Sequence, residues 1–93
     1  MKIVFKESFI NRLESQVDYI SKDSPTRARK FKNALLERIK EIPQNPYQYR
    51  KSIYFNSNTI RDLVFKGYII VFRITNERIE LFGFVKWQDK PND

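Results

Sequence analysis

The chain has 93 residues, 41% of them hydrophobic, and carries 18 Lys and Arg against 11 Asp and Glu. This size and composition suffice for one hydrophobic core, which excludes an intrinsically disordered chain and favours a single domain. The lack of cysteine and histidine excludes disulfide bonds, thiolate metal sites, and histidine as a general base or zinc ligand.

The formal net charge of +7 attracts anionic partners such as nucleic acid, an acidic protein or a membrane surface. The alternative interpretation is a surface charge that serves only solubility. The amino-terminal residues lack the apolar core and the cleavage site of a signal peptide, and no apolar run approaches the ~20 residues of a membrane span. We therefore expect a soluble, cytoplasmic protein without a membrane partner.

The first half of the chain predicts a strand and two helices. Residues 2–6 form a short strand pattern, and Ser8 is a candidate N-cap for a helix of about 13 residues. Ser24 and Pro25 mark a second helix start, because serine caps a helix and proline fits its first position. Each helix carries one apolar stripe, made by Phe9, Leu13, Val17 and Ile20 in the first and by Ala28, Phe31, Leu35, Ile39 and Ile42 in the second. We expect an antiparallel helical hairpin that covers one side of a sheet.

The second helix also has a basic face. Its members are Arg27, Arg29, Lys30, Lys32, Arg38 and Lys40. Such a face either is simply solvated or follows a phosphate backbone. The helix ends before Pro43; residues 43–49 contain a turn, and residues 50–55 predict an edge strand or an extended segment.

The stretch from residue 59 to residue 86 predicts consecutive antiparallel hairpins. Three apolar runs of strand length are separated by the two-residue polar turns Lys66-Gly67 and Asn76-Glu77. In the middle run, one face holds Tyr68, Ile70, Phe72 and Ile74, and the other holds Ile69, Val71, Arg73 and Thr75. In the last run, one face holds Ile79, Leu81, Gly83 and Val85, and the other holds Glu80, Phe82, Phe84 and Lys86. Neither strand has a polar face, so we expect helices on one surface of the sheet and function on the other.

The order of elements predicts one two-layer α+β domain that spans residues 1–93. An N-terminal strand and the antiparallel helical hairpin precede a curled antiparallel sheet of three or four strands. The tail after Lys86 contains Pro91 and few apolar residues, so we expect it to be frayed beyond about Asp89.

Recognisable catalytic motifs are absent from the sequence. Without histidine or cysteine, acid–base chemistry would fall to Asp, Glu, Lys, Arg or Tyr. The chain has no phosphate-binding loop, no dinucleotide fingerprint and no acidic spacing suited to a metal ion, so we expect neither a cofactor nor a metal site. The remaining candidates lie on the outer face of the sheet or at strand ends, and they are Arg61, Asp62, Lys66, Arg73, Lys86 and Trp87.

Several of these candidates also have a purely structural interpretation. Arg73, a charge within an apolar strand, either pairs with Glu80 or Asp62 across the sheet or serves in binding. Arg61 and Asp62 open a strand, where they either are rim charges that fix its register or belong to a site. Trp87 either stacks on a base or an aromatic partner or closes the end of the core.

The element order and the stretch IRDLVFKGYIIVFRITNERIELFGFVK resemble the RelE/ParE superfamily of small bacterial toxins, the toxin halves of type II toxin–antitoxin systems. The most telling parts are the run Ile60-Arg61-Asp62-Leu63, the hairpin at Gly67-Tyr68, and Phe72-Arg73-Ile74. The resemblance covers nearly the whole chain. Two activities occur in the superfamily: RelE-like members cut messenger RNA on the ribosome, and ParE-like members act on DNA gyrase.

The resemblance also implies where RelE-like members carry basic catalytic side chains. They have an arginine directly after the Gly-Tyr of the central hairpin and lysines on the preceding strand. This chain has Ile69 at the first position, and Ile60 and Asp62 where lysines are expected. Lys86-Trp87-Gln88 stands where ParE-like members commonly have a histidine-containing motif, and the histidine–tyrosine ending of some relatives is also missing. Because RNA cleavage needs groups that activate the 2′-hydroxyl and stabilise the pentacoordinate phosphorus, the departures from the RelE-like pattern favour the ParE-like branch, whereas the missing histidine-containing motif is a departure from the ParE-like pattern.

We therefore expect a ParE-like toxin that inhibits DNA gyrase by protein binding rather than by catalysis. Its candidates for contacts with the target or the antitoxin are Arg61, Lys66, Arg73, Lys86 and Trp87. One alternative is a ribosome-dependent messenger RNA endonuclease that uses Lys66, Arg73 and Lys86; others are a basic nucleic-acid-binding module and a toxin that has lost its target. The resemblance implies a cognate acidic antitoxin whose tail, disordered alone, wraps the toxin in a hetero-oligomer.

Overall fold

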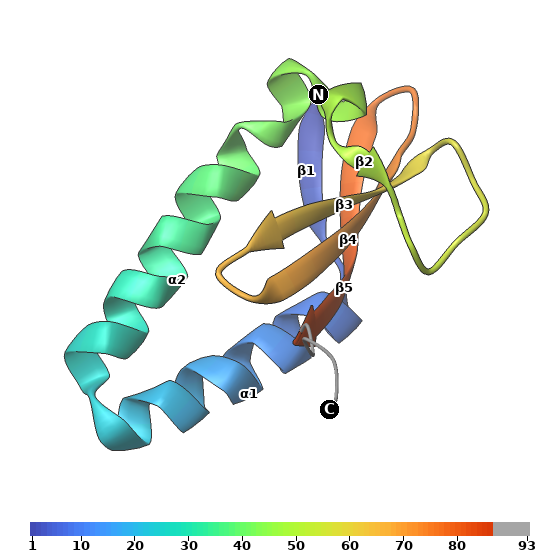
Figure 1. The fold of residues 1–93 in the computed structure, drawn as a ribbon. Helices are drawn as coiled ribbons and strands as arrows, with labels where there is room; N and C mark the ends of the chain where they lie inside the picture. Colours follow the sequence, from blue (N-terminus) through green and yellow to red (C-terminus); the bar gives the residue numbers. More distant parts are fainter. Residues whose placement is uncertain (87–93) are drawn as a thin grey trace.

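The computed structural model describes residues 1–86, so Trp87 and the tail beyond Asp89 lie outside the described residues. Its elements are β1 (Lys2–Phe5), α1 (Glu7–Asp23), α2 (Pro25–Lys40), the short 3-10 helices η1 (Ile42–Gln44) and η2 (Pro46–Gln48), β2 (Arg50–Lys51), β3 (Ile60–Phe65), β4 (Tyr68–Ile74) and β5 (Arg78–Lys86). Figure 1 shows α1 and α2 as a V that faces one side of a twisted sheet. The predicted α+β fold is confirmed.

The sheet has five strands in the order β1-β5-β4-β3-β2. The strands that follow the helices are joined antiparallel, as predicted, and β2 is an edge strand of only two residues. The N-terminal strand β1 lies at the opposite edge and pairs in parallel with β5, from Lys2 opposite Arg78 to Phe5 opposite Leu81. Because β5 continues to Lys86, its last part extends beyond β1.

Two local signals in the sequence are confirmed. Ser24 ends α1 and caps α2, where its hydroxyl accepts a hydrogen bond from the Arg27 amide at 3.1 Å and Pro25 fills the first position. Lys66 and Gly67 adopt φ values of 47° and 83°, the left-handed conformation that a two-residue hairpin turn requires. Glycine meets this requirement without strain.

The prediction that Ser8 caps α1 is wrong. The helix begins at Glu7, and its N-cap is Lys6, whose side chain makes no capping hydrogen bond. The Ser8 hydroxyl instead donates to the Phe82 carbonyl oxygen at 2.8 Å. Ser8 therefore joins the first turn of α1 to the middle of β5.

The predicted alternation is confirmed for β4 but is wrong for the second half of β5. Val71 lies opposite Gly83, whereas the next residue, Phe72, lies opposite Leu81, so Phe82 has no partner on β4. The extra residue is a β-bulge, which bends the strand and reverses the direction of the side chains that follow.

The bulge exchanges the faces of the last residues of β5. Phe84 turns toward the helices, where it is 5% exposed and its ring stacks on Tyr68 at a centroid distance of 5.0 Å. Val85 lies opposite Ile69 and therefore shares the face of the sheet that points away from the helices. Without the bulge, Phe84 would point away from the helices.

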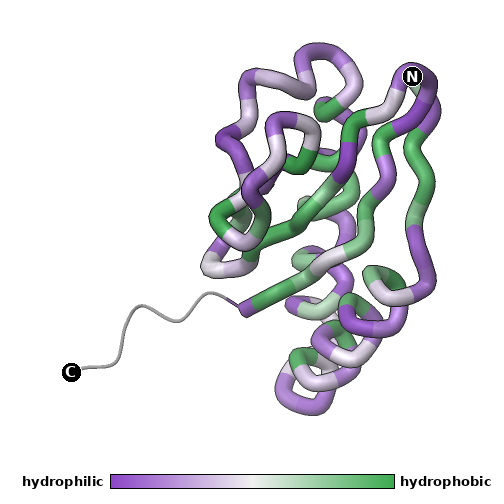
Figure 2. Tube along the Cα trace, turned by 90° about the vertical axis from the view of Figure 1, so that its right-hand side faces the viewer, coloured by the Kyte–Doolittle hydropathy of each residue, from purple (hydrophilic) through white to green (hydrophobic). Residues whose placement is uncertain are grey.

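Hydrophobic side chains fill both faces of the sheet. The larger core lies between the helices and the sheet and contains Phe9, Leu13, Leu35, Ile39, Ile42, Leu63, Phe65, Tyr68, Ile70, Phe72, Ile74, Ile79, Leu81 and Phe84. A smaller cluster of Ile60, Ile69 and Val71, with Phe82 packed against it, lies on the opposite face, which we call the open face. Figure 2 shows the strands as the most continuous hydrophobic segments of the chain. Neither α1 nor α2 is long and apolar enough to cross a membrane, and no other helix of residues 1–86 is.

Candidate functional site

One end of the open face is covered by the segment that follows β2. Asp62 of β3 holds this segment, because its Oδ2 accepts a hydrogen bond from the Ile53 amide at 3.0 Å and lies 3.4 Å from the guanidinium of Arg50. The Asp62 side chain is fully buried, and its Oδ1 has no hydrogen-bond partner among residues 1–86. Of the two interpretations of Asp62, the rim charge is wrong, since the side chain is buried.

Arg61 is also buried rather than placed at a rim. It is 9% exposed, and its guanidinium donates hydrogen bonds to the carbonyl oxygens of Tyr47, Tyr49 and Asn58 at 3.3, 2.9 and 2.9 Å. A fourth hydrogen bond goes to the side-chain oxygen of Asn58 at 2.7 Å, and the ring of Tyr47 lies 4.9 Å from the guanidinium carbon. Arg61 therefore joins the loops on either side of β2, and its polar groups are not available to a partner.

The structural interpretation of Arg73 is confirmed. Its guanidinium lies 3.4 Å from Glu80 on the neighbouring strand and 5.0 Å from the centre of the Phe82 ring. Arg78 binds the same carboxylate at 2.9 Å. The hydrogen bond from Arg78 is the main cause that lowers the pKa of Glu80 below its ordinary value, with smaller contributions from the charge of Lys6 and from Arg73.

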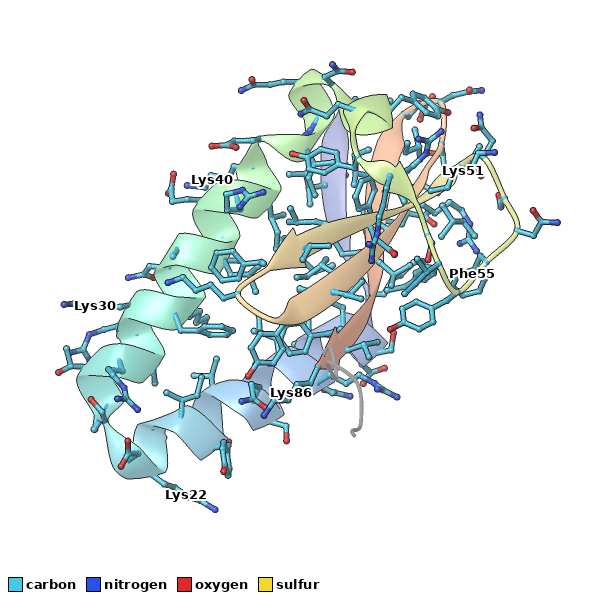
Figure 3. The ribbon with its side chains drawn as sticks, viewed as in Figure 1. Lys22, Lys30, Lys40, Lys51, Phe55 and Lys86 are labelled. Carbon is cyan, nitrogen blue, oxygen red and sulfur yellow. The ribbon has the colours of Figure 1, made fainter. Side chains whose placement is uncertain are left out.

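The other basic candidates lie at the opposite end of β4. Lys66 sits in the hairpin turn with its amine 5.5 Å from the Phe65 ring, and the exposed Lys86 lies opposite Tyr68 at the end of β5 (Figure 3). At a rise of about 3.3 Å per residue, Arg73 is some 16 Å away along the strand. The predicted basic residues therefore do not form one site.

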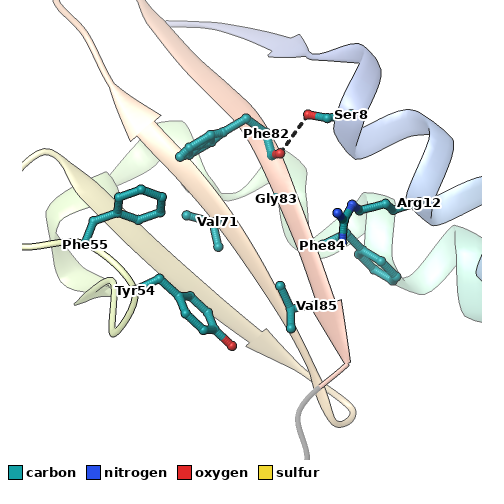
Figure 4. Close-up of a pocket in the computed structure, with 9 residues that line it drawn as sticks. All are labelled: Ser8, Arg12, Tyr54, Phe55, Val71, Phe82, Gly83, Phe84 and Val85. Atoms are coloured by element: carbon teal, nitrogen blue, oxygen red, sulfur yellow. Dashed lines mark hydrogen bonds between the residues drawn. The ribbon is translucent and has the colours of Figure 1, made fainter.

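The β-bulge creates a groove that the sequence interpretation missed. This bulge groove, of about 270 Å³, is lined by Ser8, Arg12, Tyr54, Phe55, Val71, Phe82, Gly83, Phe84 and Val85 (Figure 4). Gly83 is the signal that could have located it, because an isolated glycine within a strand pattern often marks a bulge. Among residues 1–86, Arg12 is the one cation in the lining, and none of these residues places a carboxylate there.

A second apolar groove is lined by residues of α1, of α2 and of the end of β1. This hairpin groove, of about 350 Å³, is lined by Phe5, Phe9, Ile10, Leu13, Glu14, Lys32 and Leu36. Phe5 and Ile10 are each 37% exposed, which is unusual for large apolar side chains that are neighbours on one surface. The hairpin groove therefore has the character of a protein-binding surface.

The chain matches a family model described as "ParE toxin of type II toxin-antitoxin system, parDE" over residues 3–86. It belongs to the ParE toxin family. A solved structure titled "Chromosomal ParDE TA system from P. aeruginosa" has the same fold, with a TM-score of 0.77 at 18% identity over 95% of this chain and 97% of that chain. No curated protein matches the chain. The predicted superfamily and the type II toxin class are confirmed.

In this ParE family member, the three residues that depart from the RelE-like pattern have structural roles. Ile69 and Ile60, at positions where RelE-like relatives have basic residues, are 1% and 7% exposed. Both belong to the apolar cluster of the open face, and Asp62, at the third position, is used to hold the covering segment. No cluster of residues 1–86 could hold a metal ion. These three positions of β3 and β4 therefore hold apolar or acidic side chains rather than cations.

Proposed function

We propose that this ParE-family toxin inhibits DNA gyrase by binding to it and that an acidic antitoxin neutralises it. The observation that supports binding over RNA cleavage is the burial of Ile60, Asp62 and Ile69 at the positions that carry basic groups in RelE-like relatives. Stabilising a pentacoordinate phosphate requires exposed donors or cations, and a buried isoleucine supplies neither. A gyrase inhibitor acts in the cytoplasm, so the proposal assigns the protein to that compartment.

The antitoxin part of the proposal is supported by charge and by the hairpin groove. The net charge of +7 attracts an acidic chain over a long distance, and exposed Phe5 and Ile10 provide an apolar anchor at close range. An amphipathic helix buries its apolar face in such a groove and leaves its polar face at the rim, where Lys32 lies. Lys32 lines the groove and makes no ion pair with another residue of the described chain.

A supercoiling assay with purified DNA gyrase tests the proposal. We expect the toxin at micromolar concentration to block the supercoiling of relaxed plasmid, and we expect the product of the neighbouring gene to restore it when added in equal amount. A translation reaction with the same toxin serves as the control and should leave messenger RNA intact. Codon-phased cleavage of the message with undisturbed supercoiling would contradict the proposal and support the endonuclease alternative.

A further inference from the structure

The turn between β3 and β4 points into the V that α1 and α2 form (Figure 1). A pocket of about 380 Å³, which we call the V pocket, lies at this turn. It is lined by Ile20 of α1, by Arg27, Lys30 and Phe31 of α2, and by Lys66 of the turn. Two helices and a hairpin turn therefore contribute to one pocket.

Cations make up most of the polar lining of the V pocket. No carboxylate of residues 1–86 lines it, and neither Lys30 nor Lys66 makes an ion pair with another residue of the described chain. Arg27 pairs with Asp23 at 2.8 Å, but both side chains are largely exposed, so this ion pair is weak. The described residues therefore compensate the three positive charges of the pocket only in part.

An exposed aromatic ring lies beside these cations. A second pocket, of about 470 Å³, is lined by Tyr19, Ile20, Lys22, Asp23 and Arg27. It shares Ile20 and Arg27 with the V pocket, so the two pockets adjoin. Tyr19 is 68% exposed, and it lies near enough to Tyr68 to contribute, after burial, to the raised pKa of the Tyr68 hydroxyl. A ring that the fold leaves in solvent is therefore a neighbour of the basic pocket.

The combination of cations and a free aromatic ring decides what kind of ligand fits. Phosphate oxygens accept hydrogen bonds from lysine and arginine, and an unpaired base stacks on an aromatic side chain. A duplex keeps its bases stacked on one another, so it could use the cations but not Tyr19. An acidic peptide could also use the cations, but its carboxylates gain nothing from the ring. A single strand is the ligand that uses both features.

We propose that the V pocket binds the phosphate backbone of a single-stranded nucleic acid and that Tyr19 stacks on one of its bases. Arg27, Lys30 and Lys66 contact the phosphate oxygens, and the strand continues over Ile20 and Arg27 into the adjoining pocket. Neither pocket shares a lining residue with the bulge groove or the hairpin groove. The site is therefore separate from the proposed antitoxin contact, and it does not depend on whether the toxin acts on gyrase.

Fluorescence anisotropy with the full chain and labelled strands of about eight nucleotides tests the proposal. We expect a dissociation constant below about 100 µM at about 50 mM salt. DNA and RNA strands of the same sequence are compared; binding of either one supports the proposal, and the tighter of the two identifies the source. The corresponding duplex should bind at least about fivefold more weakly, because it cannot stack on Tyr19. A glutamate peptide of equal charge should not displace the strand.

Two matched lysine variants separate this site from general attraction by the net charge of +7. Lys66→Gln and Lys51→Gln remove the same charge from exposed positions, but Lys51 lines neither pocket. We expect about a fivefold loss of affinity and a smaller salt dependence in Lys66→Gln, since it removes a phosphate contact. Lys51→Gln should lose less than about twofold.

Two variants of Tyr19 test the stacking contact at an exposed position that the fold does not need. Tyr19→Ala should weaken binding of the single strand about fivefold or more and leave binding of the duplex unchanged. Tyr19→Phe keeps the ring and should bind as the native chain does. Equal losses in the two lysine variants, unchanged affinity in Tyr19→Ala, a duplex that binds as tightly as the strand, displacement by the glutamate peptide, or no binding of either strand would each overturn the proposal.

Discussion

Glu80 is the residue at which positive charges converge on the sheet. Arg78 donates to its carboxylate from the same strand, Arg73 approaches it from β4, and Lys6 lies close enough to act through its charge. Its side chain is 8% exposed, so the carboxylate is shielded from solvent while it remains ionised. These contacts keep Arg73 in place against Phe82 at the border of the open face.

The lowered pKa of Glu80 predicts a specific loss of stability in acid. A carboxyl group whose pKa is lower in the folded chain adds stability above its ordinary pKa of 4.5, and this stability is lost as the pH falls through the folded pKa. We expect the urea midpoint of the native chain to fall steeply from about pH 5 downwards, and we expect Glu80→Gln to flatten this fall. Glu14→Gln, at an exposed position without an ion pair in residues 1–86, serves as the control and should keep the native profile. Parallel profiles for all three proteins would contradict the assignment.

At the level of strands, the two glycines of the chain serve different purposes. Gly67 has a φ of +83°, and a Cβ atom added there would meet nothing within 4 Å. The φ of Gly83 lies outside the left-handed range, but an added Cβ would lie 3.0 Å from both the Cβ and the Cγ2 of Val71. The hairpin therefore needs glycine for its conformation, and the bulge needs glycine for the close approach of β4.

Substitutions at the two glycines should separate these reasons. We expect Gly83→Ala to lower the free energy of unfolding by about 1–3 kcal/mol through overpacking against Val71. Gly67→Ala should cost about 1–2 kcal/mol through backbone strain alone. Asparagine tolerates the left-handed conformation, so Gly67→Asn should cost less than Gly67→Ala, whereas Gly83→Asn should cost at least as much as Gly83→Ala. Urea unfolding monitored by circular dichroism measures all four, and the same rank order at both positions would contradict the explanation.

The elements that the sequence predicted correctly are those with a strong local pattern. Ser24-Pro25, Lys66-Gly67 and the alternation of β4 depend only on neighbouring residues, and all three are confirmed. The prediction that Ser8 caps α1 failed because the Ser8 hydroxyl donates a hydrogen bond to the carbonyl oxygen of Phe82, 74 residues away in the sequence. No local pattern reveals such a contact. The predicted faces of β5 are wrong from Gly83 onward for a related reason, since the bulge at Phe82 lies where β5 pairs with β4, far away in sequence.

The buried charges were missed for another physical reason. A charge at the start of a strand ordinarily lies in solvent, which made Arg61 and Asp62 look like rim residues. The loops on either side of β2 have no periodic pattern, so the sequence could not show that they fold over both residues. The same loops supply Tyr54 and Phe55 to the bulge groove, so the candidate site depends on the part of the chain that was least predictable.

At the level of the whole molecule, charge and apolar surface are arranged to act at different distances. The net charge of +7 attracts an anionic partner before it touches the protein surface. The hairpin groove contributes only once the partner is in contact with it. For the proposed acidic antitoxin, we therefore expect the overall field to guide it to the toxin and contacts in the hairpin groove to retain it. Long-range attraction changes mainly the association rate, and contacts buried in the complex change mainly the dissociation rate.

The rates of antitoxin binding should show this division. Raising the salt concentration from about 50 to 500 mM should slow association about tenfold or more and change dissociation little. Ile10→Ala, which keeps the net charge and removes an exposed side chain of the hairpin groove, should speed dissociation at every salt concentration. Arg29→Gln, which removes one charge outside both grooves, should instead slow association at low salt and leave dissociation unchanged. Stopped-flow mixing measures both rates. If salt acted mainly on dissociation, or if Ile10→Ala slowed association as Arg29→Gln does, the charges would be direct contacts and the groove would not be the anchor.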